Sequence, residues 1–172
     1  MATTTRTQAA PGRRSGGSAR SPRHTLGSLG RMSQRQLDGL FSGSPAGPTP
    51  VGVADGRAIV APGTPLGAGL QPLLHLAWGG KVFYPERQDL LNRIGPFGVM
   101  LARAQVYRGP SWVDGAETIV LDYSTGALPF RSIRDEIREV APGLYLGVVY
   151  WVGTKTINFA LQFRGATSDA RH

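Results

Sequence analysis

The 172-residue chain contains no cysteine, which excludes disulfides, thiolate metal sites, iron–sulfur clusters and cysteine nucleophiles. No apolar run approaches the roughly 18 residues that a membrane-spanning helix needs. Histidine is also scarce: His24 and His172 lie near the ends, so His75 alone cannot form a histidine metal cluster, and no serine motif supports a Ser-His-Asp triad. Glycine (24 residues) and proline (13 residues) are abundant, which favours many turns over long helices.

Acidic residues are missing from the first 36 positions, which hold seven arginines and therefore carry a charge of +7. Residues 37–172 contain twelve basic and eleven acidic side chains, so the rest of the chain is almost neutral. A nucleic-acid-binding groove needs basic residues clustered on a folded surface. We therefore predict no specific nucleic-acid partner.

The composition divides the chain into three parts. Residues 1–32 are predicted to be a disordered basic tail, because Ala, Ser, Thr, Gly, Pro and Arg dominate and no apolar periodicity is present. Such a tail is either a solvated arm with salt-sensitive affinity for polyanions or an organelle transit peptide. Arg13-Arg14 lacks the apolar stretch of an export signal, so we expect a cytoplasmic protein. Residues 33–166 are predicted to form one domain, followed by a short tail at 167–172.

A short helix is predicted at residues 33–42, at the start of this domain. Ser33 and Gln36 have the spacing of a capping box, in which each side chain satisfies a free backbone N–H of the other residue. Leu37, Leu40 and Phe41 follow at helical spacing. We therefore expect one apolar face of the helix to lie on the domain.

The apolar residues change to strand periodicity from residue 51 onward. Residues 71–77 are either a short helix or a strand, and residues 130–140 also fit a helix, although their short connections favour a strand. Only the strand places Asp135 between Ile133 and Ile137 on a buried face. Seven strands are predicted, at residues 51–61, 81–84, 99–107, 117–124, 130–140, 144–152 and 157–163.

Short strands joined by tight turns predict a mainly β fold, an antiparallel up-and-down meander that follows a short N-terminal helix. Such a sheet closes into a barrel because closure removes its unpaired edges. A barrel of roughly eight strands has an interior just wide enough for side chains or one small ligand.

Four segments occur in a recognisable order: Gly52-Val53-Ala54-Asp55-Gly56, Ala77-Trp78-Gly79-Gly80-Lys81, Ile133-Arg134-Asp135-Glu136-Ile137-Arg138 and Leu146-Gly147. Together they resemble the signature of the small bacterial GXWXG proteins, over about residues 37–150. Ala54 stands where those proteins have tryptophan, and Ile137 replaces an aromatic residue. The resemblance implies a calycin-type, lipocalin-like β-barrel that holds a small apolar ligand, and it implies no settled activity.

Asp135 and Tyr123 are the candidate catalytic residues. A carboxyl group inside a barrel must be ion-paired or have a raised pKa, so Asp135 is either an acid–base or ligand-binding group or half of a structural ion pair with Arg103 or Arg131. Tyr123 is expected inside, whereas Asp122 is a strand-end acid. The candidate ligand-binding residues are Trp78, Lys81, Arg103, Tyr123, Arg131, Asp135, Tyr145 and Phe159; no cofactor or metal is expected.

Several of these candidates have a plainer interpretation. Trp78 and Lys81 bracket two glycines. Either the glycines form a backbone kink that lets a ligand approach closely, or Trp78 packs in the core and Lys81 lies on the surface. Tyr145 and Phe159 serve as core or as cavity lining. His75 is a core or rim residue, or has an acid–base role near Trp78.

Three functions agree with this sequence. The first is the binding of a small hydrophobic molecule, such as a fatty acyl, isoprenoid or polyketide-like compound, in a barrel with a polar anchor. The second is a cyclase or isomerase that folds such a molecule and moves a proton with Asp135 or Tyr123. The third is a protein-interaction module with a basic tail. The oligomeric state is left open.

Overall fold

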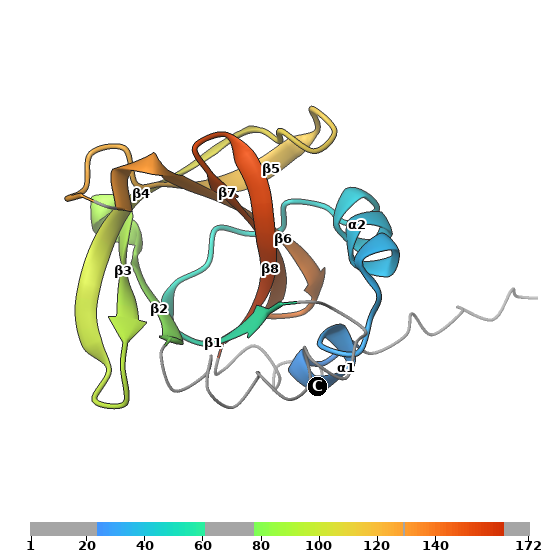
Figure 1. The fold of residues 1–172 in the computed structure, drawn as a ribbon, viewed down its shortest axis with the longest axis horizontal. Helices are drawn as coiled ribbons and strands as arrows, with labels where there is room; N and C mark the ends of the chain where they lie inside the picture. Colours follow the sequence, from blue (N-terminus) through green and yellow to red (C-terminus); the bar gives the residue numbers. More distant parts are fainter. Residues whose placement is uncertain (1–23, 61–77, 129, 164–172) are drawn as a thin grey trace, which may run out of the picture.

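The described residues form one closed β-barrel in a computed structural model, which covers residues 24–60, 78–128 and 130–163. Each strand pairs antiparallel with its neighbour in the sequence, and the last strand pairs with the first (Figure 1). The predicted mainly β, up-and-down barrel with a short N-terminal helix is confirmed. The strands are β1 (Gly52–Ile59), β2 (Trp78–Tyr84), β3 (Asp89–Ile94), β4 (Val99–Pro110), β5 (Glu117–Asp122), β6 (Ile133–Ala141), β7 (Leu144–Trp151) and β8 (Thr154–Phe163).

The described residues contain eight strands, so the prediction of seven strands was wrong. The missing strand is β3, in which Leu90, Asn92 and Ile94 alternate with outward residues. Asn92 stands at the centre of this inward-facing row, so the sequence does not show a continuous alternation of apolar residues there. The ambiguous segment 130–140 is a strand from Ile133 onward, after a short 3₁₀ helix, η2 (Phe130–Ser132). Residues 71–77, with His75, lie outside the described residues.

Two helices precede the barrel and lie outside it (Figure 1). α2 (Gln34–Ser42) begins at the predicted capping box, in which Ser33 accepts a hydrogen bond from the Gln36 backbone. α1 (Leu26–Leu29) corrects the predicted tail at residues 1–32, because residues 24–32 are folded. Leu29 is fully buried in a cluster that includes Ile59, and the partly buried Leu26 packs against the same cluster. Residues 1–23 and 164–172 lie outside the description.

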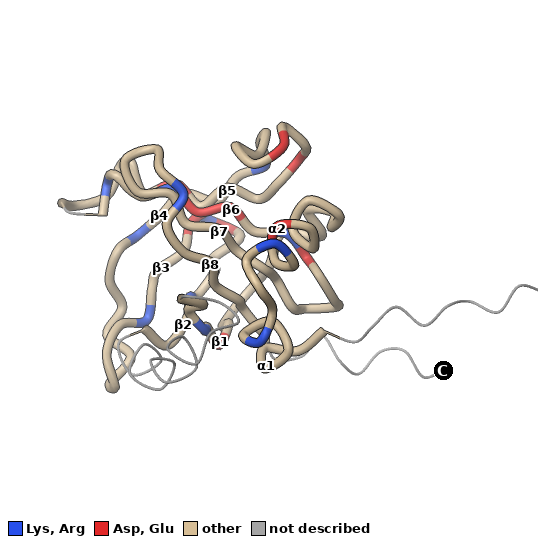
Figure 2. The backbone as a smooth tube through the Cα atoms, turned by 45° about the vertical axis from the view of Figure 1, so that its right-hand side comes forward, with Lys and Arg blue, Asp and Glu red and all other residues tan. Residues whose placement is uncertain are grey.

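Apolar side chains form two cores, one inside the barrel and one between the helices and the outer face of β7 and β8. β6 carries both signs of charge (Figure 2), and its outer face is covered. Arg138 is buried there, donates to the carbonyl of Phe41 at 3.1 Å and makes a two-pronged ion pair with Asp114. A guanidinium at the carboxyl end of α2 also suits the helix dipole.

The up-and-down topology gives the barrel two different ends. We call the end that carries the β1–β2, β3–β4, β5–β6 and β7–β8 connections the mouth end, and the opposite end the filled end. The filled end is packed with the larger part of the inner core, including Phe83, Tyr145 and Phe163. Within residues 24–60, 78–128 and 130–163, no helix combines the length and apolar character needed to cross a bilayer.

Candidate functional site

A cavity of about 290 Å³ lies inside the barrel toward the mouth end. Its lining residues stand near the ends of strands that meet there, as Ala58 does in β1, Trp78 in β2 and Ile94 in β3. Most of the wall is aliphatic or aromatic. The lining is completed by Lys81, Asn92, Ala102, Tyr123, Phe130, Ile133, Asp135, Val149, Ile157 and Phe159.

A buried ion pair forms the polar floor of this cavity. Lys81 Nζ lies 3.0 Å from Asp135 Oδ2, and both side chains are almost completely shielded from solvent. The ammonium also donates to Asn92 Oδ1 at 2.8 Å and to the Tyr123 hydroxyl oxygen at 2.5 Å. Since an ammonium group has three N–H donors, these three acceptors use all of them.

Asn92 connects the rest of the polar cluster. Its Oδ1 accepts from the Trp78 indole N–H at 3.1 Å, and its Nδ2 donates to the Ala102 carbonyl at 2.8 Å and to the Tyr123 oxygen at 2.9 Å. The Tyr123 hydroxyl donates in turn to Asp135 Oδ2 at 3.3 Å. Every donor of the cluster therefore has an acceptor inside the cluster or in the adjoining backbone.

One polar atom of the cluster lacks a partner. Asp135 Oδ1 is buried and accepts no hydrogen bond from any of the residues described. Buried polar atoms in folded proteins nearly always have a partner, because leaving one unpaired costs about 1–3 kcal/mol and more for a charged group. Asp135 lines the cavity, but Oδ1 itself has almost no accessible surface, so a donor on a bound molecule would reach this oxygen only after the neighbouring side chains shift.

The electrostatics keep Lys81 and Tyr123 of the cluster protonated. Burial raises the pKa of Asp135, and the Lys81 ammonium limits that rise. Burial would lower the pKa of Lys81, but the charge of Asp135 and the contact with Tyr123 outweigh burial, so the pKa is raised. Burial raises the pKa of Tyr123 to about 12. At neutral pH, Lys81 is therefore a fixed cation, Tyr123 keeps its proton, and Asp135 is the group best suited to accept one.

Two glycines of the sequence motifs shape the cavity wall. A Cβ at Gly56 would lie 2.7 Å from the Trp78 indole, and one at Gly147 would lie 2.2 Å from the Phe159 ring. Each glycine thus leaves room for an aromatic ring. The two rings meet edge to face with centroids 5.6 Å apart, and Lys81 Nζ lies 5.4 Å from the Trp78 ring centroid and 5.3 Å from that of Phe159. Contacts at this range add cation–π stabilisation to the buried charge.

Comparisons with known proteins bear on the fold. No family model matches the sequence, and no curated protein matches it. A crystal structure of a protein from Thermomonospora curvata is similar to this chain, with a TM-score of 0.51 and 21% sequence identity over 78% of this chain and 90% of that one. That likeness shows the barrel fold. It shows nothing about the ligand.

The cavity brings together five of the eight predicted ligand-binding residues. Trp78, Lys81, Tyr123, Asp135 and Phe159 all line it, and the inward orientation of Asp135 and Tyr123 agrees with the prediction from strand alternation. The plainer interpretation of position 81 as a surface lysine was wrong. It is buried because the carboxylate, the amide and the phenol oxygen replace the water that its ammonium would otherwise bind.

The other three predicted residues lie elsewhere. Arg103 is 66% exposed and forms an ion pair with Asp89, and Arg131 is exposed on η2, so the predicted ion pair of Asp135 with either arginine was wrong. Strand alternation turns the Arg103 side chain outward, whereas Lys81 faces inward. Tyr145 belongs to the filled end, where its hydroxyl donates to the Pro48 carbonyl at 2.7 Å.

Asn92 is the functional candidate that the sequence analysis missed. It shares the inner face of β3 with Leu90, which is fully buried, and with Ile94, which lines the cavity. The alternation of Leu90, Asn92 and Ile94 before the Gly95-Pro96 turn was the available signal.

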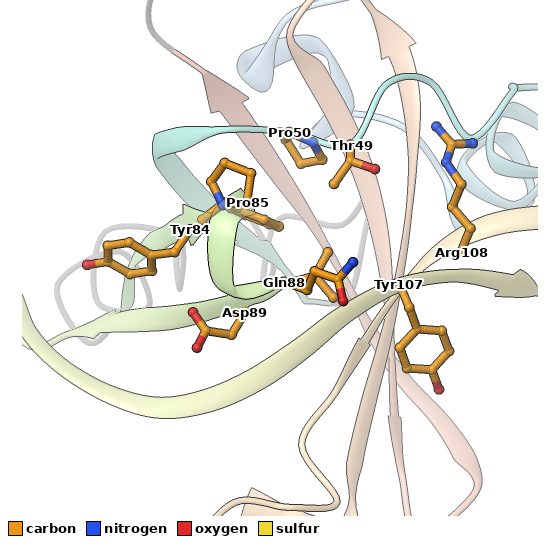
Figure 3. A pocket seen from close by; sticks show the side chains of 10 residues that line it. Thr49, Pro50, Tyr84, Pro85, Gln88, Asp89, Tyr107 and Arg108 are labelled. Atoms are coloured by element: carbon orange, nitrogen blue, oxygen red, sulfur yellow. The ribbon is translucent and has the colours of Figure 1, made fainter.

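A larger cleft, of about 410 Å³, lies at the filled end (Figure 3). Its lining combines Pro85, the first residue of η1 (Pro85–Arg87), and the residues that flank this helix with residues 49–50 and 106–108, and Asp89 lies at one side. The charge of Asp89 is already balanced, because Arg103 pairs with Oδ2 and Arg87 Nε lies 3.5 Å from Oδ1. Among the described residues, no group of three or more His, Asp or Glu side chains could hold a metal ion. The barrel cavity is therefore the better candidate site.

Proposed function

We propose that the barrel binds one small, mainly apolar molecule that donates a hydrogen bond to Asp135. The observation that carries this proposal is Asp135 Oδ1, an unpaired buried oxygen in a residue that lines an otherwise apolar cavity. Apolar walls supply affinity at about 25 cal/mol per Å² of buried apolar surface. The single open acceptor then orients the ligand, as a few fixed polar groups do in other small-molecule sites.

The hydrogen-bond pattern selects among ligand head groups. The donors of Lys81, Asn92 and Trp78 are all used within the cluster or by the adjoining backbone, so an acidic ligand would find no free donor. A ligand carboxylate would also face the charge of Asp135 across a medium of low dielectric. An alcohol, a phenol or an amine satisfies Asp135 Oδ1 instead. Among lipid-like and polyketide-like molecules, the proposal therefore favours hydroxyl compounds over fatty acid anions.

The size of the cavity limits how much of the ligand is enclosed. A volume of about 290 Å³ lies just below the usual range of small-molecule pockets, about 300–1,000 Å³. At about 30 Å³ for each water-sized group, roughly ten non-hydrogen atoms fit inside. A longer chain would place its hydroxyl end on Asp135 and leave the rest in the mouth. The resemblance to GXWXG proteins and calycin-type barrels supports the same use of the fold.

Binding of 1-octanol and octanoate, measured by calorimetry, tests the head-group preference. These probes share one chain length, and we expect octanol to bind at least about ten-fold more tightly, the factor that one charge-assisted hydrogen bond provides. Asp135→Asn should weaken octanol binding and shrink the difference, whereas Asp122→Asn, at a strand end outside the cavity, should not. Equal affinity for the two probes, or binding of neither, would refute the proposal.

A second variant guards against misfolding of Asp135→Asn. Ile133 lines the cavity and its apolar side chain takes no part in the hydrogen bonds of the polar cluster, so Ile133→Trp should fill the space and block octanol binding while those bonds are kept. Thermal unfolding of each variant confirms that it is folded. Octanol binding that survives in a folded Ile133→Trp protein would place the ligand outside the barrel.

A second candidate function is an isomerase or cyclase on the same site. The observation that favours it is the combination of an unpaired lone pair and a raised pKa at Asp135, since a more basic carboxylate accepts a proton more readily. Asp135 would take a proton from the bound molecule, while Lys81 holds the carboxylate in place. In that case Asp135→Asn should abolish turnover and leave part of the binding, whereas a simple binder shows only the loss of affinity.

A further inference from the structure

The mouth end presents apolar side chains to solvent at the tips of its connections. Phe97, between β3 and β4, is 93% exposed, and Val152, between β7 and β8, is 74% exposed. Exposed residues of this kind in one patch mark a surface that contacts another apolar phase. We call the following set the apolar rim: Phe97, Val99, Leu128, Trp151 and Val152.

Strand register places the apolar rim beside the cavity. Val99 pairs with Ile94, and Trp151 pairs with Ile133. Residues directly opposite each other in an antiparallel pair share one face of the sheet. Because Ile94 and Ile133 line the cavity, Val99 and Trp151 continue its apolar wall outward to the solvent. Two members of the apolar rim, Val99 and Trp151, therefore border the cavity at the mouth end.

Val152 has a strained backbone conformation, which indicates that its side chain has a role other than stabilising the fold. Val152 has a φ of 50° and Gly153 a φ of 75°, in the two-residue connection between β7 and β8. Asn-Gly is the sequence that suits such a turn, whereas a β-branched residue at positive φ is strained. The strained valine is also largely exposed, so packing does not repay the strain.

Charged residues of both signs lie near the apolar rim, because Asp122, the last residue of β5, lines a small pocket together with Arg131 and Gly153. The described residues of the mouth-end connections at 95–98, 123–132 and 152–153 contain no Asp or Glu, and their charged residue is the exposed Arg131. The chain enters β1 at the filled end, but α1, which follows residues 1–23, packs in one cluster with Ile59, the last residue of β1, at the mouth end. Residues 1–23, which precede α1, contain five arginines and no acidic residue.

We propose that the mouth end docks on an anionic lipid bilayer, with the apolar rim in the interface and the arginines near the headgroups. Aromatic and aliphatic side chains flanked by Lys or Arg have this affinity, since the apolar groups bury in the acyl boundary while the cations meet acidic lipids. A second copy of the chain fits less well, because a mouth-to-mouth contact would bring the arginines of both copies together. Docking goes beyond ligand binding, and it gives a sparingly soluble molecule a route into the cavity that avoids water.

Sedimentation of the full-length protein with vesicles tests the docking. We expect binding to phosphatidylcholine vesicles that contain about one third phosphatidylserine, and weaker binding to pure phosphatidylcholine and at high salt. Val152→Asn should reduce binding at least about five-fold and also raise the melting temperature, because asparagine suits the positive φ. Lost docking in a more stable protein cannot be attributed to unfolding.

The matched control is Val51→Asn, the same substitution at a valine that is 62% exposed at the filled end. It should leave vesicle binding unchanged. The proposal is overturned if neither vesicle binds, if the two valine variants lose binding equally, or if Val152→Asn changes the mass of an oligomer while vesicle binding stays the same. The assay needs no molecule in the cavity, so a failure of octanol binding would leave this result independent.

Discussion

Replacing Lys81 by methionine should destabilise the barrel by about 3–5 kcal/mol, because it removes the cation that balances a buried carboxylate. Lys81 Nζ lies 3.0 Å from Asp135 Oδ2, with both side chains buried. The other two acceptors of Lys81 lose less: Asn92 still receives the Trp78 N–H, and the Tyr123 oxygen still receives the Asn92 amide. The penalty therefore falls on Asp135. It is a large part of the roughly 5–15 kcal/mol that stabilises a domain.

Urea unfolding, followed by tryptophan fluorescence, measures this penalty. Without Lys81 the pKa of folded Asp135 rises further above the unfolded value of about 3.9, so the folded state binds a proton more tightly than the unfolded state. Stability of the variant must then increase as pH falls, and the penalty at pH 5 should be smaller than at pH 7. The double variant Lys81→Met/Asp135→Leu should recover most of the loss. A penalty below about 1 kcal/mol, or one that does not shrink with pH, would refute the buried charge pair.

Three further outcomes follow from other contacts. Gly147→Ala should destabilise the protein by about 1–3 kcal/mol in urea, since its Cβ would meet the Phe159 ring at 2.2 Å; an unchanged midpoint would contradict this packing. The contribution of Lys81 to stability is present below pH 10.5, the unfolded pKa, and should be lost as pH rises through its raised folded pKa; in alkaline melts the double apolar variant should lack this loss. Arg138→Met should cost about 3 kcal/mol, because it leaves carbonyls of α2 and Asp114 without their partner, whereas the exposed Arg35→Met should cost almost nothing in the same melts.

The barrel was predictable because most of its strands have one apolar face. Alternation around Ile133 and Ile137 was enough to place Asp135 inside, and the pair Asp122–Tyr123 identified the inward tyrosine. β3 was not predictable by the same rule. Its inner row contains Asn92, which resembles an exposed residue until Lys81 and Tyr123 supply its partners from other strands.

For Lys81, the chemical type of the residue and its position in the strand gave opposite predictions. Phe83 is buried two positions later, so the period of a strand places Lys81 on the same inner face. Its charge argued for the surface, because a lysine is almost never buried without a partner. That partner, Asp135, lies 54 positions away in the sequence. Local pattern can give the direction of both side chains, but their pairing depends on the closed barrel.

The pairing of β1 with β8 has a consequence for synthesis on the ribosome. Ala54 lies opposite Phe163 in this seam, so the sheet cannot close until the chain has been made as far as residue 163. A ribosome adds about 5–20 residues each second, so several seconds pass between the synthesis of β1 and that of β8. During this time the backbone edge of β1 has no partner and can pair with other chains. Contacts between positions so far apart also slow folding after release. Shortening the nascent chain before residue 154 would remove the seam and leave an open sheet in need of a chaperone.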